Sequence, residues 1–177
     1  MYRSLQGRLL VATPTLGDPN FARSVVLVAE HGPDGAMGLI LNRPLGVTVR
    51  EAVPILGEFV ADGEAVHQGG PVQPERLVLA AWQSSPDGFR LHFGIEPAQA
   101  TELLSEEDTH VRAFLGYSGW SAGQLENEMK ASTWIVADVP GDLLSHPQDD
   151  SLWRAVLGRE GAEWRLLAGE PEDLERN

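Results

Sequence analysis

The chain has 177 residues, no cysteine and a formal net charge of −13, from 13 lysines and arginines against 26 aspartates and glutamates. One domain with a substantial core fits this length, and 42% hydrophobic residues exclude a disordered chain. The missing cysteines remove disulfides, thiolate chemistry and most structural zinc sites, and the acidic surface disfavours binding to a phosphate backbone.

The first residues show no targeting or membrane signal. The apolar run that ends at Pro14 is too short for the hydrophobic region of a signal peptide. No later run approaches the ~20 apolar residues that a membrane helix needs. We therefore expect a cytoplasmic protein without a membrane partner.

The first 45 residues predict three strands. Residues 9–12 form a short apolar run, and residues 24–29 (SVVLVA) are continuous and β-branched, as in a strand buried on both faces. Residues 32–35 (GPDG) then supply a turn before a third strand at 37–41. The second and third strands should form a hairpin.

A helix and a second hairpin follow. Residues 47–59 have a helical pattern in which Thr48 and Glu51 have the spacing of a capping box, and Pro54 should kink the helix or end it early. Residues 76–82 and 89–93 read as strands joined by a turn at 84–88.

The second half alternates helices and strands. We predict helices at 97–105, 123–131 and 145–157, strands at 110–117, 133–139 and 164–168, and a frayed acidic tail at 169–177. Glu126 and Lys130 can pair on the outside of the second of these helices. No repeat of fixed period is present, so we expect a single α+β domain over residues 1–177, with a mixed sheet and surrounding helices.

Residues 119–123 (GWSAG) match the G-x-S-x-G pattern of a hydrolase nucleophile, and Asp138, Asp142 and His146 follow in the order of a catalytic triad. Such a hydrolase core needs a long run of parallel βαβ units, which this chain lacks. His146 precedes a proline at a predicted helix start, where a local capping role suffices. We expect Ser121 to be a helix N-cap, with a hydrolase as the alternative.

Polar residues flank the first hairpin. Glu30 and His31 should point to opposite faces of a strand, so they cannot both bind one metal ion. A lone histidine beside a turn favours a structural, hydrogen-bonded role for His31 over a role as ligand or base. Asn42 and Arg43 follow the third strand. Arg43 could hold Glu30 or another strand-end carboxylate; an unpaired Arg43 facing a cleft would favour an anionic ligand.

Two glycine-rich segments each have a structural and a functional interpretation. Gly69 and Gly70 either form an amide nest or let one backbone pass close to another. In residues 116–126 the glycines should permit tight turns, with Trp120 in a core corner and Gln124 tying down neighbouring carbonyls. Alternatively, Tyr117 or Trp120 walls a pocket for a small anion or a peptide terminus.

These segments resemble the AlgH/YqgE family of small bacterial proteins. The resemblance rests on the blocks GRLLVATPTLGDPNFARSVVLVAE at 7–30, EHGPDGAMGLILNRP at 30–44, GGPV at 69–72 and GYSGWSAGQLE at 116–126. It implies a compact α/β fold with a branched, partly barrel-like sheet. The family motif does not demand serine at position 121, and members are sometimes labelled transcriptional regulators without an established activity.

We therefore predict a non-catalytic binding or regulatory protein that acts through a protein partner or a small anionic ligand, with no cofactor and no metal. The oligomeric state stays open. Alternatives are an enzyme, with a hydrolase site at Ser121 or an acid–base site at His31, and, less favoured, a direct DNA-binding regulator. The candidate surface comprises Glu30, His31, Asn42, Arg43, Gly69, Gly70, Tyr117, Trp120 and Gln124.

Overall fold

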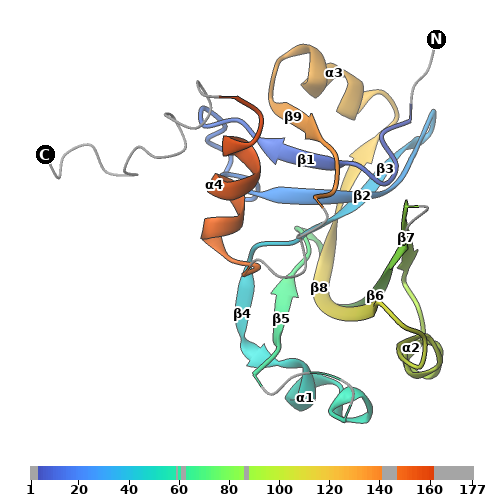
Figure 1. The fold of residues 1–177 in the computed structure, drawn as a ribbon. Helices are drawn as coiled ribbons and strands as arrows, with labels where there is room; N and C mark the ends of the chain where they lie inside the picture. The colour runs from blue at the N-terminus through green and yellow to red at the C-terminus, as the bar shows by residue number, and fades with distance from the viewer. Residues whose placement is uncertain (1–3, 59, 61–62, 86–87, 141–146, 162–177) are drawn as a thin grey trace, which may run out of the picture.

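The computed structural model describes residues 4–58, 60, 63–85, 88–140 and 147–161 (Figure 1). Within this part of the chain, nine strands form one mixed, branched sheet, around which the helices pack. The α+β class and the branched sheet expected from the sequence are confirmed.

The first wing of the sheet is antiparallel. It contains, in spatial order, β3 (Gly35–Ile40), β2 (Val25–Gly32), β1 (Leu9–Ala12) and β9 (Trp134–Ala137). Side chains on both faces are buried, so residues 25–28 have no exposed surface, as a continuous β-branched run predicts. The hairpin predicted at residues 32–35 is also confirmed, because Gly32 pairs with Gly35.

The long strand β8 (Thr109–Ser121) joins this wing to a second one. Its residues 118–121 pair with β3, and its residues 109–117 pair with β6. The second wing consists of β4 (Pro44–Thr48), β5 (Ala65–Gln68), β6 (Val72–Ser85) and β7 (Gly88–Phe93). Figure 1 shows β8 curving between the two wings. The strand is longer than the predicted 110–117, and β4 was not predicted, because residues 118–121 and 44–48 do not keep a simple apolar alternation.

Helices cover the faces of both wings. The second wing is covered by α1 (Val49–Ala52), the 3-10 helix η1 (Pro54–Leu56) and α2 (Pro97–Leu104). The first wing carries α3 (Gln124–Lys130) on one face and α4 (Asp150–Gly158) on the opposite face.

Two predicted helices are shorter than expected. The capping box of Thr48 with Glu51 is confirmed, but β4 occupies residues 47 and 48, and α1 ends before Pro54. Asp149 caps α4 through the amide of Ser151, so this helix begins at residue 150. Residues 145–146, the strand predicted at 164–168 and the acidic tail lie outside the described residues.

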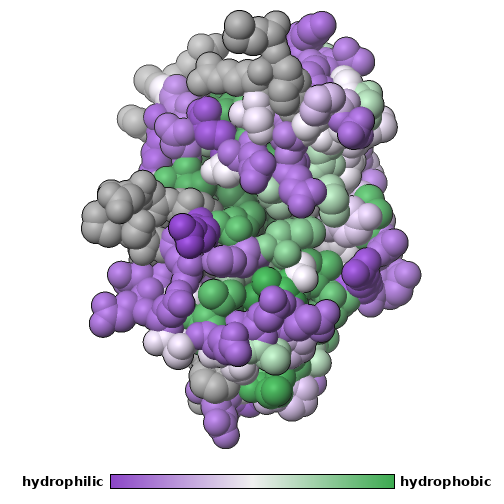
Figure 2. All heavy atoms as spheres, turned by 90° about the vertical axis from the view of Figure 1, so that its right-hand side faces the viewer, coloured by the Kyte–Doolittle hydropathy of each residue, from purple (hydrophilic) through white to green (hydrophobic). Residues whose placement is uncertain are grey.

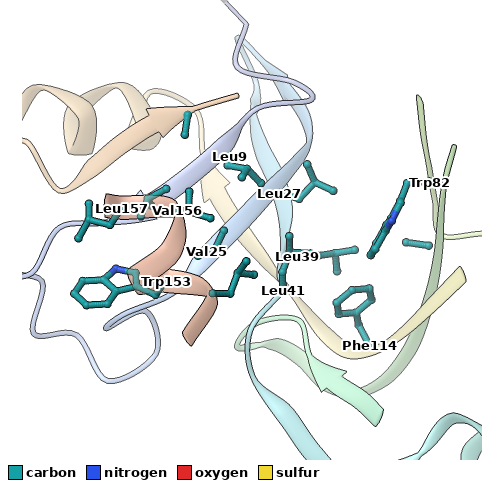
Figure 3. Packing of buried hydrophobic residues seen from close by; sticks show 14 of the residues in the cluster. Leu9, Val25, Leu27, Leu39, Leu41, Trp82, Phe114, Trp153, Val156 and Leu157 are labelled. Carbon is teal, nitrogen blue, oxygen red and sulfur yellow. The ribbon is translucent and has the colours of Figure 1, made fainter. Parts of the chain in front are cut away.

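The largest core cluster lies between α4 and the second wing (Figure 3). Leu27 and Leu39 of the first wing stand between Trp153 of α4 and Trp82 of β6. The indole of Trp153 also donates a 2.8 Å hydrogen bond to the carbonyl oxygen of Ala12. Helix α4 is thereby fixed to β1 by packing and by one directional contact.

Two backbones cross where β5 leaves the sheet. A Cβ atom on Gly70 would lie 2.2 Å from the carbonyl carbon of Tyr117 in β8. Gly116 has a φ of 73°, and its Cβ would lie 2.5 Å from the carbonyl oxygen of Gly70. Only glycine fits at both positions, so the close-passage interpretation of the Gly69-Gly70 pair is confirmed.

Candidate functional site

His31 links three segments through both ring nitrogens. Its Nδ1 accepts a 2.9 Å hydrogen bond from the backbone N–H of Leu5, and its Nε2 lies 2.6 Å from Oε1 of Glu126 in α3. Because Nδ1 accepts, the proton resides on Nε2 and is donated to the carboxylate. Only 2% of the side chain is exposed. His31 is therefore buried and hydrogen-bonded on both ring nitrogens, as the structural interpretation of this residue predicts.

This contact redirects Glu126. The hydrogen bond from His31 is the main cause that holds the pKa of Glu126 below its ordinary value, with a smaller contribution from the charge of Lys130. The close partner of the Glu126 carboxylate is therefore His31, and the expected partner Lys130 acts on it only through its charge. A buried imidazole offers a fixed donor, whereas Lys130 is a flexible, exposed cation.

Ser121 closes β8 and does not cap α3. Its Oγ lies 3.2 Å from Oε1 of Gln124, which also accepts the Ser121 backbone N–H at 3.0 Å. The N-cap is Gly123, with a φ of 77°, because the chain needs a left-handed turn between the strand and the helix. The N-cap prediction for Ser121 is wrong, and so is the expectation that Gln124 ties down carbonyls. Gln124 instead binds Ser121 and donates to Glu128 at 2.9 Å.

The remaining residues of the triad-like order do not assemble around Ser121 in the described part of the chain. Asp138 forms a 2.7 Å ion pair with Arg8. Asp142 and His146 lie outside the described residues. Among the residues that are described, no imidazole forms a hydrogen bond with Ser121.

Trp120 fills a core corner, as expected. It is 5% exposed and stacks on Phe21 with ring centroids 6.1 Å apart. Oε1 of Glu128 accepts the indole N–H of Trp120 at 3.2 Å and that of Trp134 at 2.9 Å. This shared acceptor ties β8, α3 and β9 together, which gives Trp120 a structural role.

Asn42 and Arg43 hold the loop before β2. The amide of Asn42 accepts the N–H of Val25 at 3.0 Å and donates to the carbonyl oxygen of Arg23 at 2.9 Å. Arg43 donates to the carbonyl oxygens of Pro19 and Ala22 at 3.1 and 2.9 Å. Burial lowers the pKa of this guanidinium, although nearby carboxylates oppose the shift.

Of the two kinds of partner expected for Arg43, Glu30 is wrong, because Arg43 contacts the loop before the start of β2 whereas Glu30 lies near the end of that strand. Arg43 does line a hollow with a volume of about 740 Å³, but Asp149 and Asp150 line the same hollow. Arg43 already donates to two carbonyl oxygens, and the charges of Asp150 and Asp18 act on it, so its guanidinium is engaged within the protein and does not favour an anionic ligand here.

A second hollow, of about 530 Å³, lies at the tip of the β2–β3 hairpin. Glu30, His31 and Trp120 line it together with Asp34 and Met37. The imidazole there is already bonded on both nitrogens, and Glu30 is exposed to solvent. The hollow therefore brings three candidate residues together, but neither ring nitrogen of His31 is free to act as an acid or a base.

Tyr117 lies on a third surface, which we call the apolar groove. The groove has a volume of about 270 Å³ and is walled by Met37, Leu77, Leu79, Phe93, Ile95 and Tyr117, with Arg76 and Glu96 among its other lining residues. Figure 2 looks at the side that carries β7 and α2, where hydrophobic residues gather in a band between hydrophilic margins. Tyr117 and Trp120 therefore belong to different hollows.

The nine candidate residues do not form one surface. Three line the hairpin-tip hollow, two line the hollow near α4, Tyr117 lines the apolar groove, Gly69 and Gly70 are buried in the crossing, and Gln124 is exposed on α3. Sequence reasoning missed the groove walls contributed by β6 and β7. The sequence feature that could have indicated the groove is Leu77, an apolar residue that directly follows the polar stretch at 73–76. In the structure its side chain is 38% exposed.

Among the residues that the structure describes, no group of three or more histidine and carboxylate side chains is arranged to hold a metal ion. The described helices are also too short or too polar to cross a membrane.

Comparison with known proteins gives consistent matches over almost the whole chain. The model of the AlgH-like family (DUF179) matches residues 9–165. A UPF0301 protein of Streptomyces avermitilis is 38% identical over 186 residues, covering 98% of this chain and 96% of the relative. A UPF0301 protein of Chlorobium luteolum is 35% identical over 179 residues, covering 96% and 93%.

Two solved structures share the fold. The crystal structure of protein DIP2367 from Corynebacterium diphtheriae has a TM-score of 0.79 at 26% identity, covering 96% of this chain and 94% of that one. The solution structure of the AlgH protein from Pseudomonas aeruginosa has a TM-score of 0.66 at 27% identity, covering 98% and 100%. Both similarities extend across the two wings of the sheet.

Proposed function

The chain belongs to the AlgH-like family, and from this premise we propose that it is a non-catalytic binding protein whose apolar groove receives an apolar segment of a partner protein. The observation that supports the proposal most is the groove itself. It is open, walled by aliphatic and aromatic side chains, and includes Leu77, which is 38% exposed. An apolar surface of this kind on a chain with net charge −13 is typical of a docking site.

The size of the groove favours a peptide side chain over a cofactor. Its volume of about 270 Å³ lies below the ~300–1,000 Å³ of pockets that enclose drug-sized ligands. Burial of one large apolar side chain contributes about 1.5–3 kcal/mol, so one or two anchors would give a weak, reversible complex. Such affinity suits a regulatory contact.

A catalytic role has less support. The two groups proposed for it are engaged elsewhere: His31 by Leu5 and Glu126, and Ser121 by Gln124. Direct contact with nucleic acid also stays the least favoured prediction, because the net charge of −13 opposes a phosphate backbone.

A random peptide library displayed against the purified protein tests the proposal. We expect enrichment of peptides with large apolar side chains and selective shifts of the amide resonances of Leu77, Phe93 and Ile95 on binding. Leu77→Asp should weaken binding about tenfold or more, since it places a charge on the groove wall.

Ile55→Asp is the matched control. Ile55 is 57% exposed and is not among the residues that line the groove, so this variant should bind the selected peptides like the unaltered protein. The proposal fails if no peptide is enriched, or if both variants bind the enriched peptides equally well.

A further inference from the structure

The apolar groove has a cation on its lining. Arg76, on β6, is exposed, and its Nη1 donates a 3.2 Å hydrogen bond to Oε1 of Gln73, a neutral amide. Among the described residues no carboxylate lies within ion-pair distance of Arg76. Glu96 lines the same groove without pairing with it. The positive charge of Arg76 is therefore available to a ligand.

A second polar group, Tyr117, lines the same groove as this cation. Tyr117 is half-buried, and its hydroxyl has no hydrogen-bond partner within the described part of the chain. In the sheet, Leu77 pairs with Leu115, and Val72 pairs with Tyr117. The residues between them, 73–76, form a bulge opposite the single residue Gly116, and Arg76 is the last residue of that bulge. Arg76 and Tyr117 both line the groove.

These two donors share one groove with an apolar wall. A guanidinium and a phenol hydroxyl together match a carboxylate, because the guanidinium can bind both carboxylate oxygens and the phenol can add a third hydrogen bond. Phe93, Ile95 and Leu79 supply the surface for an apolar side chain beside that anion. The ligand should therefore carry a carboxylate next to a large apolar group.

We propose that the apolar groove binds the free C-terminus of a partner protein whose last residue is apolar. This inference rests on the proposed function and adds the chemical group that is recognised. A terminal carboxylate lies directly beside the side chain of the last residue, which matches the arrangement of Arg76 and Tyr117 against the apolar wall. The net charge of −13 disfavours an acidic partner segment, so the rest of that segment is neutral or basic.

Salt screens the repulsion between the carboxylate of the ligand and the distant negative charges of the protein. At physiological salt, charges farther apart than about 8 Å interact weakly through solvent. Arg76 then attracts a carboxylate that lies beside it, and Glu96 on the same lining repels one that lies beside Glu96.

Two forms of one random hexapeptide library, one with free C-terminal carboxylates and one with C-terminal amides, test the inference. We expect peptides ending in large apolar residues to be enriched only from the free-acid form. For each selected sequence, the amide should bind about tenfold more weakly or worse, the usual cost of losing a charge-assisted hydrogen bond.

Variants test the named donors. Arg76→Gln should lower affinity for the free acid about tenfold and leave affinity for the amide unchanged, and Tyr117→Phe should cause a smaller loss with the same selectivity. Arg90→Gln is the control, because it removes one exposed positive charge from β7, away from the groove lining. Arg76→Lys, which keeps the charge, should retain part of the affinity.

The outcomes separate the two proposals. Enrichment from both library forms with equal affinity, or equal effects of Arg76→Gln and Arg90→Gln, overturns the C-terminal inference and leaves the binding groove in place. Enrichment from neither form overturns both. Enrichment from the free-acid form alone, lost in Arg76→Gln, supports both.

Discussion

The imidazole of His31 donates from Nε2 to Glu126 across 2.6 Å, which joins β2 to α3 in the described structure. His31 also accepts the amide of Leu5, so one side chain fixes the N-terminal segment, a central strand and a helix that are distant in sequence. A side chain held in this way contributes to the fold, and its removal should be read first as a change in stability.

Replacement Glu126→Gln should change how stability depends on pH. The folded pKa of Glu126 is lowered, chiefly by the His31 hydrogen bond, so its stabilisation is fully present above the ordinary glutamate pKa and is lost as pH falls through the lowered folded value. Since Glu126 is partly exposed, we expect a difference of about 1 kcal/mol or less at neutral pH. Urea unfolding from neutral pH to pH 3 measures it; a difference that grows on acidification would contradict the assignment.

Replacement His31→Ala should destabilise the protein by about 2 kcal/mol, because it removes a buried imidazole together with its hydrogen bonds to the N–H of Leu5 and to the partly exposed carboxylate of Glu126. Ser121→Ala should shift the free energy of unfolding by no more than about 0.5 kcal/mol, since Ser121 is exposed. Thermal melts of both variants measure these effects. An acid–base enzyme would instead show an unchanged melting temperature for His31→Ala together with lost turnover in an esterase or phosphatase panel.

Replacement Gly70→Ala should cost more than about 3 kcal/mol, since the new Cβ would lie 2.2 Å from the Tyr117 backbone, which cannot move without breaking β8. Gly17→Ala is the control, because an added Cβ there meets nothing within 4 Å. Denaturant unfolding of both proteins compares the two costs. Equal stability of both variants would mean that the crossing is looser than described.

Trp153 allows packing and hydrogen bonding to be separated. Trp153→Phe keeps an aromatic ring but removes the 2.8 Å bond to Ala12, for an expected loss of about 1 kcal/mol. Trp153→Ala also leaves a cavity in the largest core cluster, for an expected loss of about 3–5 kcal/mol. Chemical denaturation gives both values. Similar losses for the two variants would show that α4 contributes little packing energy.

Short-range sequence patterns were enough to predict most of the helices, strands and turns. The β-branched run at 25–28, the turn at 32–35, the box of Thr48 with Glu51 and the proline that opens α2 each specify structure through neighbours within a few residues. Side-chain period and turn chemistry act over the same short range, so they can be read without knowing the fold. The wrong predictions concern side chains whose hydrogen-bond partners are distant in sequence. Glu126 binds His31, and Arg43 binds the carbonyl oxygens of residues 19 and 22.

The fold class, the hairpins and the family motifs could be predicted from the sequence, because apolar period, capping and glycine spacing are local properties. The packing of distant segments, by contrast, divides six of the nine candidate residues among three hollows and brings Arg76, Phe93 and Tyr117 into one groove. That grouping depends on β8 pairing with β3, β5 and β6 at once. The path of a curved strand through two wings is set by packing between distant segments, which short-range patterns do not encode.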